Sequence, residues 1–147
     1  MLSVRAATFA DEGAALDLIE ELFEPPGSQP SGYRRERAAI ALRHAVEQPE
    51  ADVLLAMDGE RPVGLASVYV DVQTIRFGQR CWLEDLVITA SERGRGIGRQ
   101  LLDAATEWAR AHRCTHLGLV SAAARRDAHR FYVANGMMTS QHFTRTV

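Results

Sequence analysis

Residues 83–102 combine an apolar stretch, a glycine-rich turn and an amphipathic segment, and they constrain the fold more than any other part of the chain. The stretch 81–89 is predominantly apolar, which predicts a buried strand. The run 94–98 (Gly-Arg-Gly-Ile-Gly) ends that strand and opens a predicted helix to about residue 112. One face of this helix is apolar and consists of Ile97, Leu101, Ala105 and Trp108. A buried strand that leads directly into an amphipathic helix predicts a mixed α/β fold.

The rest of the chain alternates strands and helices, without an internal repeat or an interdomain linker. Strands are expected at residues 2–6, 53–57, 62–70, 81–89 and 116–120, with one or two more in 138–147. Helices are expected at about residues 8–23, 33–48, 94–112 and 127–135. Asp58-Gly59 between two apolar runs indicates a β-hairpin. We therefore expect a single domain over residues 1–147, with a mixed central sheet of about six to seven strands and about four flanking helices.

Composition excludes several function classes. All 17 basic residues are arginine, and the absence of lysine removes Schiff-base chemistry. A net charge of −2 without a dense basic run argues against nucleic acid as a partner. The apolar runs are far shorter than the ~20 residues that cross a bilayer, and the N-terminus lacks a signal-peptide pattern. Cys81 and Cys114 lack the spacing of a disulfide framework or a metal site, so we expect a cytoplasmic protein with reduced thiols, no metal and no membrane partner.

The glycine-rich turn predicts an anion-binding site. Glycines allow close approach of the backbone, and the free N–H groups of the following helix point toward the anion. Arg93, Arg95 and Arg99 add positive charge at the same place, so a pyrophosphate is the expected ligand. A Walker A loop is excluded because it needs lysine. A Rossmann fingerprint is excluded because neither register of G-x-G-x-x-G/A ends in glycine or alanine.

Two motifs resemble the GNAT superfamily of N-acetyltransferases. Arg93-x-x-Gly96-x-Gly98 after an apolar strand is similar to the superfamily's acetyl-CoA loop, Arg/Gln-x-x-Gly-x-Gly/Ala. The run 126–137 (Arg-Asp-Ala-His-Arg-Phe-Tyr-Val-Ala-Asn-Gly-Met) resembles its later helix, which carries Ala-x-x-Phe-Tyr and ends in glycine. With the matching order of elements, the resemblance extends over nearly the whole chain. The residues of the second motif most resemble those of small-molecule amine acetylases, including aminoalkylphosphonate and aminoglycoside N-acetyltransferases.

The resemblance implies that acetyl-CoA is the acetyl donor and that an amine attacks it directly, without a covalent enzyme intermediate. It implies that the backbone of Leu86, Val87 and Ile88, in a strand that splays from its neighbour, binds the pantetheine arm. The same resemblance assigns the donor's phosphates to the loop and helix start, namely Arg93, Gly94, Arg95, Gly96, Ile97, Gly98 and Arg99. Many relatives have asparagine three residues before the helix alanine. Here that position is Arg125, which either leaves the pantetheine contact unmade or meets a CoA phosphate.

Tyr132 falls at the family's general-acid tyrosine. A phenol with a pKa near 10 can protonate a leaving thiolate and remain un-ionised at neutral pH. The alternative is a core aromatic beside Phe131, because adjacent helical side chains cannot face one direction.

Glu84 is the candidate general base. Strand alternation predicts a common face for Glu84, Leu86 and Ile88. The carboxylate could take the amine proton directly or through water, hold a cationic amine, or lie at an exposed strand end without a role. Asp85 points the other way unless a bulge reverses the alternation, and is the reserve candidate.

The leading function is transfer of an acetyl group to the amine of a small molecule. The alternatives are a protein or peptide N-acetyltransferase and a non-catalytic acyl-CoA-binding module. The charges near the expected acceptor site point in two directions, because Asp71, Glu84 and Asp85 favour a polycation whereas Arg76 and Arg80 favour an anionic group. Dimers are common among similar proteins, so a homodimer is a further expectation. His129, Cys81, Cys114 and Trp108 are expected to have structural roles.

Overall fold

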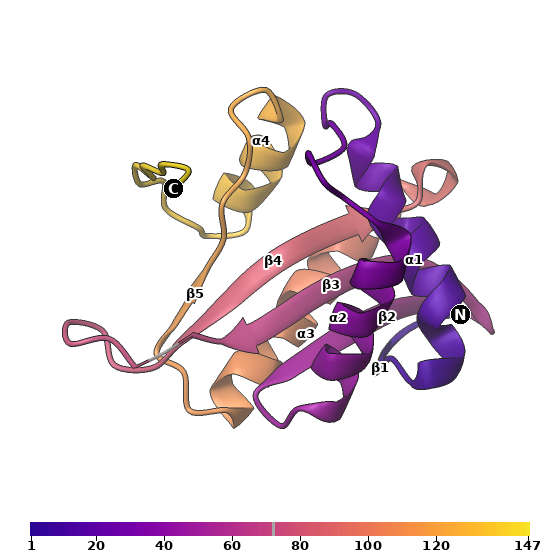
Figure 1. Ribbon diagram of the computed structural model, residues 1–147, viewed down its shortest axis with the longest axis horizontal. Coiled ribbons are helices and arrows are strands. Elements are labelled where there is room, and N and C mark those ends of the chain that lie inside the picture. The colour runs from indigo at the N-terminus through magenta and orange to yellow at the C-terminus, as the bar shows by residue number, and fades with distance from the viewer. Residues whose placement is uncertain (72) are drawn as a thin grey trace.

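The computed structural model describes residues 1–71 and 73–147, which form a sheet with helices on both faces (Figure 1). The elements in chain order are β1 (Leu2–Ala6), η1 (Phe9–Asp11), α1 (Glu12–Glu20), η2 (Glu21–Phe23), α2 (Arg35–Glu47), β2 (Ala51–Asp58), β3 (Arg61–Val70), β4 (Arg80–Ile88), η3 (Ala90–Glu92), α3 (Ile97–Ala111), β5 (His116–Gly118) and α4 (Arg126–Ala134), where η marks a 3₁₀ turn.

The strand order in the sheet follows the chain, from β1 at one edge to β5 at the other. Strands β1 to β4 are antiparallel to their neighbours, whereas β4 and β5 are parallel. The predicted hairpin joins β2 and β3, and Gly59 in its turn has a φ of +62°, a conformation that side chains other than glycine rarely adopt. The predicted mixed α/β fold and its four α-helices are thus confirmed.

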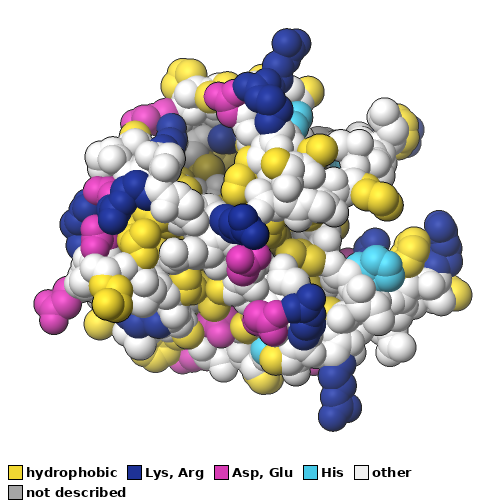
Figure 2. All heavy atoms as spheres, turned by 180° about the vertical axis from the view of Figure 1, so that it is seen from behind, with side chains coloured by type: hydrophobic (Ala, Val, Ile, Leu, Met, Phe, Trp, Pro, Cys, Tyr) yellow, Lys and Arg dark blue, Asp and Glu magenta, His cyan; other side chains and the backbone are white. Residues whose placement is uncertain are grey.

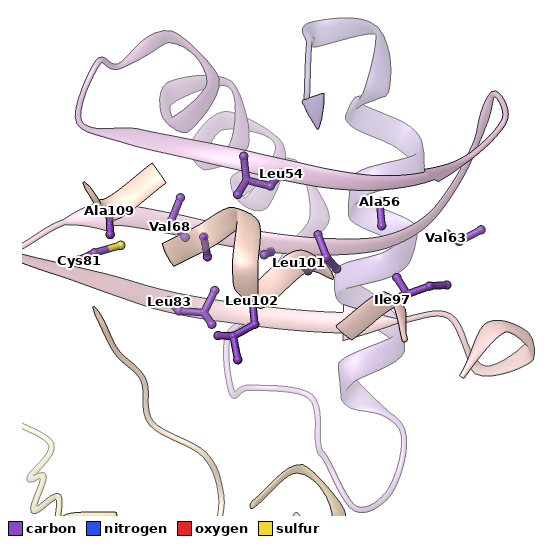
Figure 3. Close-up of a cluster of buried hydrophobic side chains, with 12 residues drawn as sticks. Leu54, Ala56, Val63, Val68, Cys81, Leu83, Ile97, Leu101, Leu102 and Ala109 are labelled. Carbon is purple, nitrogen blue, oxygen red and sulfur yellow. The ribbon is translucent and has the colours of Figure 1, made fainter. Parts of the chain in front are cut away.

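Each face of the sheet has its own apolar core. Helix α3 covers one face, where Ile97 and Leu101 pack with Leu83 of β4 (Figure 3). Helices α1 and α2 cover the other face, where Leu18 and Leu42 belong to the second core (Figure 1). Because both faces are covered, the central strands are continuously apolar rather than alternating. The α3-side core fixes the start of α3, and therefore the glycine loop, against the end of β4.

The prediction of one or two strands at the C-terminus is wrong. Residues 138–147 contain no strand, so the described chain has five strands rather than six to seven. The side chains of Met138 and Phe143 are 94% and 87% exposed, which means that no apolar face holds this segment on the sheet. β5 is shorter than expected, and none of its three residues is buried.

Candidate active site

The glycine loop has the geometry of an anion site. Gly94 and Gly96 have φ values of +83° and +79°, and Gly96 is the N-cap of the 15-residue helix α3. A Cβ added at either position would meet no atom within 4 Å, so the backbone faces open space. No acidic residue lies in the first turn of α3. The N–H groups and the dipole at this helix end are therefore available to a negatively charged group.

The three arginines near the loop differ in their surroundings. Arg93 donates from Nε to the carbonyl of Ile88 at 3.2 Å. Arg95 instead pairs with Asp58 at 3.1 Å and with Glu92, whose pKa is lowered by hydrogen bonds from Arg61 and Arg95. Arg99 is exposed on the first turn of α3. The structure thus ties Arg95 into an acidic pair rather than into a common cluster with the other two.

The second half of β4 has an open edge. β5 pairs with β4 only from Arg80↔His116 to Trp82↔Gly118, and within the described chain no strand continues along that edge. Leu86, Val87 and Ile88 keep their antiparallel partners in β3. Backbone groups on the other edge, apart from the Ile88 carbonyl that accepts from Arg93, are therefore available to an extended ligand. This edge leads directly into the glycine loop, so the two features fit one long donor with a phosphate end.

Helix α4 packs on the start of α3 and presents two adjacent aromatics. Phe131 belongs to the α3-side core, and a Cβ added at Gly98 would lie 3.3 Å from its Cζ. Tyr132 meets the Phe131 ring edge-on, with 5.4 Å between the centroids. The side chain of Tyr132 is half-buried, and burial raises its pKa while the charge of Arg125 opposes that rise. Its phenol is therefore protonated at neutral pH, as a general acid requires.

Glu84 occupies a bulge, and this changes the expected faces of β4. Ser67 pairs with Asp85 and Val68 with Leu83, so Glu84 is the extra residue between them. Leu86 and Ile88 consequently pack on the α3 side together with Leu83. The predicted common face of Glu84, Leu86 and Ile88 is therefore wrong, because the bulge reverses the alternation at Glu84 itself.

Asp85, beside the bulge, is a second candidate for the general base. Its carboxylate accepts a hydrogen bond of 2.7 Å from the hydroxyl of Ser67, and its backbone N–H donates to the same oxygen at 3.0 Å. Burial raises the pKa of Asp85, the Ser67 bond opposes this, and the charge of Glu84 adds to the rise. A carboxyl with a raised pKa is better suited to accept a proton near neutral pH. From the sequence, Asp85 was a candidate base only if a bulge reversed the alternation of the strand.

A cavity of about 560 Å³ lies beside the bulge. Its walls are formed by Tyr69, Asp71, Arg80, Trp82, Glu84, Val120 and His142. Trp82 donates from Nε1 to Glu84 at 2.8 Å, and Arg80 pairs with Asp71 at 3.2 Å. Arg76 lies over the ring of Phe77, 4.8 Å from its centroid, and does not line the cavity. The aromatic residues Tyr69 and Trp82 were missed in the sequence, although both alternate with core residues on neighbouring strands.

Arg125 points to a loop rather than to the start of α3. Its Nη2 donates to the carbonyl of Leu22, 2.8 Å away, at η2. The sequence did not predict this partner for Arg125.

The cysteines, His129 and Trp108, which were expected to have structural roles, make the following contacts. Cys81 is buried, and burial raises the pKa of its thiol to about 12, while burial also raises the pKa of Cys114. His129 contacts the hydroxyl of Ser121 at 3.2 Å, and Trp108 stacks on His112 with 3.7 Å between the centroids.

The described residues contain no cluster of His, Cys, Asp or Glu suited to a metal ion, and among them no helix is both long and apolar enough to span a membrane. On the face shown in Figure 2, most arginines lie beside acidic side chains instead of forming one basic patch.

Comparison with known proteins identifies the family of this chain. The Acetyltransferase (GNAT) family matches residues 15–137. An aminoalkylphosphonate N-acetyltransferase of Salmonella typhimurium is 31% identical over 95% of this chain and 86% of its own length. An uncharacterized N-acetyltransferase of Bacillus subtilis, YhdJ, is 46% identical over 59 residues, which cover 40% of this chain and 42% of that protein. The fold and the glycine loop define an acyltransferase, and the chain belongs to the GNAT acetyltransferase family.

Solved structures show the same fold. A transcriptional regulator from Bacillus halodurans C-125 superimposes with a TM-score of 0.82 at 24% identity, over 100% of this chain and 99% of that one. The aminoglycoside N-acetyltransferase AAC(6')-Iy in complex with CoA gives a TM-score of 0.85 at 15% identity, over 100% of this chain and 94% of that one. The enzyme class predicted from the sequence, an N-acetyltransferase, is confirmed, and acetyl-CoA is the acetyl donor that goes with this family.

Proposed function

We propose that this protein transfers the acetyl group of acetyl-CoA to the primary amine of a small molecule that also carries an anionic group. The observation that carries the proposal is the open edge of β4, which runs from the bulge at Glu84 to the glycine loop. One end of this edge suits a phosphate-bearing donor, and the cavity with its carboxylate lies at the other end. The 31% identity to an aminoalkylphosphonate N-acetyltransferase supports the same substrate class.

The donor would be held by backbone groups rather than by reactive side chains. The N–H groups at the start of α3 would bind its phosphates, with Arg93 and Arg99 as neighbouring cations. Those backbone groups of Leu86, Val87 and Ile88 that neither bond to β3 nor accept from Arg93 would hold its extended arm and orient its carbonyl. When bound, acetyl-CoA supplies a thioester that an amine can attack directly.

Two side-chain roles complete the reaction. A carboxylate at the bulge, Glu84 or Asp85, takes one proton from the amine, so that the nitrogen lone pair can form the new N–C bond. The C–S bond breaks, and the phenol of Tyr132 gives its proton to the departing thiolate. Tyr132 suits this role because burial keeps it protonated. As the amide forms, the nitrogen of the former ammonium group loses a second proton, which restores the phenol of Tyr132, and the carboxylate returns its proton to solvent. No covalent enzyme intermediate is needed.

The acceptor is inferred from the charges that line the cavity. Glu84 has a tryptophan N–H as its partner and can attract the ammonium group. Arg80 shares its Nη2 with Asp71, and its buried Nε has no hydrogen-bond partner among the described residues. Arg80 lines the cavity, and a guanidinium there is suited to an anionic oxygen. Together the two residues favour a zwitterionic amine, such as an aminoalkylphosphonate, over a polycation.

A panel of acceptors tests this function. CoA thiol released from acetyl-CoA is followed with a thiol reagent in the presence of aminoalkylphosphonates, aminoglycosides, neutral amines and peptides. We expect the phosphonates to react fastest, and Arg80→Ala to raise their KM by about tenfold, on the order of one lost charge-assisted hydrogen bond. Arg76→Ala is the matched control and should leave that KM unchanged. Faster turnover of peptides would contradict a small-molecule acceptor, and faster turnover of aminoglycosides, unaffected by Arg80→Ala, would contradict an anionic one.

The role of Glu84 is tested separately with Glu84→Gln. If Glu84 is the base, kcat falls and is largely rescued at high pH. If it only anchors the ammonium group, KM for the amine rises and kcat is retained. Neither effect, together with a kcat loss in Asp85→Asn, would assign the base to Asp85.

A further inference from the structure

Arg125 connects helix α4 to a distant part of the chain. It is the N-cap of α4, and its Nη2 donates to the carbonyl of Leu22 at 2.8 Å, across 103 positions of sequence. Figure 1 shows the start of α4 beside the loop that follows η2. A hydrogen bond from a charged donor is about twice as strong as one between neutral groups, so this contact can hold the two segments together.

Gly27 provides the space for the guanidinium. A Cβ added at Gly27 would lie 2.3 Å from Nη2 of Arg125 and 2.0 Å from the oxygen of Leu22. The backbone folds back at this point, where the N–H of Gly27 donates to the carbonyl of Glu24 at 2.8 Å. The φ of Gly27 is not in the left-handed region, so glycine is required here for space rather than for backbone freedom. Any side chain at position 27 would displace the arginine or its acceptor.

The same segment is fixed at its other end to the end of β4. The carboxylate of Glu21 accepts hydrogen bonds from the hydroxyl of Thr89 and the backbone N–H of Ala90, each 3.2 Å long. Thr89 and Ala90 follow β4 and precede the glycine loop. Residues 21–27, which we call the bridge segment, therefore link the end of β4 to the start of α4.

We propose that Arg125 is a positioning residue that holds α4, and with it Tyr132, at a fixed place relative to β4 through the bridge segment. This inference rests on the proposed function, because it assigns Tyr132 the reacting proton. A second contact that fixes α4 is the packing of Phe131 on the start of α3. The nearness of the two residues is also visible in the pKa of Tyr132, which the Arg125 charge lowers against the effect of burial.

Hydrogen exchange tests the link without any substrate. In the protein alone, Arg125→Ala and Gly27→Ala should each raise amide exchange in the bridge segment and in the first turn of α4 by about tenfold. The double variant should exchange no faster than the single ones, because both changes remove the same contact. Arg126→Ala, at an exposed neighbouring arginine, is the control and should leave exchange unchanged. Unchanged exchange in Arg125→Ala would overturn the proposal, whether or not the protein proves to be an acetyltransferase of small amines.

Kinetics then separates positioning from donor binding. We expect Arg125→Ala and Gly27→Ala to lower kcat by about tenfold while KM for acetyl-CoA stays within twofold. In a Tyr132→Phe background, Arg125→Ala should have little further effect, since the group it positions is gone. A raised KM for acetyl-CoA in Arg125→Ala, without any effect of Gly27→Ala, would overturn the proposal and assign Arg125 to a CoA phosphate. A loss of stability with kcat unchanged would reduce the contact to a purely structural one.

Discussion

Tyr132 combines a half-buried phenol with a nearby guanidinium, and the two act on its pKa in opposite directions. Burial raises that pKa, whereas the Arg125 charge lowers it. The balance keeps the proton on the phenol at neutral pH and limits how strongly it is held. This is the condition in which a side chain can give a proton to a departing thiolate.

Tyr132→Phe removes the phenolic proton with little change in shape. We expect kcat to fall about 10²-fold, the usual scale for a general acid, with little change in CoA affinity. Steady-state rates combined with a CoA binding titration measure the two effects separately. Turnover equal to that of the parent would instead make Tyr132 a packing residue beside Phe131.

Asp85 yields a prediction about stability and pH. Its pKa in the folded protein is raised from the ordinary 3.8, mainly by burial. The folded state therefore binds the proton more tightly than the unfolded state. The resulting stabilisation is complete below the unfolded pKa and is lost as pH rises through the folded pKa. Because Asp85→Asn does not titrate, this variant should be more stable than the parent at pH 7, with the advantage shrinking as pH falls toward 4.

Urea unfolding of the parent and of Asp85→Asn at several pH values measures this difference, with exposed Asp103→Asn as the control. A variant that is less stable than the parent at pH 7 would mean that the Ser67 hydrogen bond to the charged carboxylate outweighs the burial.

At the level of elements, the position of α3 determines the shape of the proposed donor site. The helix is held on the sheet by fully buried residues such as Leu101, and its first turn follows directly from Gly96. β4 contributes the bulge and the open edge on the other side of the loop. The loop therefore keeps its shape only as long as α3 and β4 stay packed.

Leu101→Ala should show this dependence. Loss of a fully buried leucine costs about 3 kcal/mol of unfolding free energy, because it leaves a cavity between α3 and the sheet. Denaturant titration measures that loss, and Gln100→Ala on the exposed side of the helix should change stability by less than about 0.5 kcal/mol. A similar stability for both variants would contradict the packing of α3 described above.

At the scale of the whole molecule, the strongest sequence patterns gave the correct fold. The glycine loop, the apolar face of α3 and the Asp58-Gly59 hairpin are local signals, and each is found where it was expected. The absence of C-terminal strands and the bulge at Glu84 depend instead on which segments of the chain pair in the sheet, and this is not a local property of the sequence. Arg125 reaching Leu22 is a contact across 103 positions, and no local pattern predicts such a partner. The position of the glycine loop was thus predictable, whereas the orientation of the side chains around it was not.

Binding of CoA to the glycine loop and the open edge of β4 tests the central claim most directly. A ligand that binds only the folded state raises Tm by mass action. We predict a CoA-dependent rise in Tm for the parent. Gly96→Asp should show no rise, although its circular dichroism should resemble that of the parent. No change in the Tm of the parent at millimolar CoA would contradict the account.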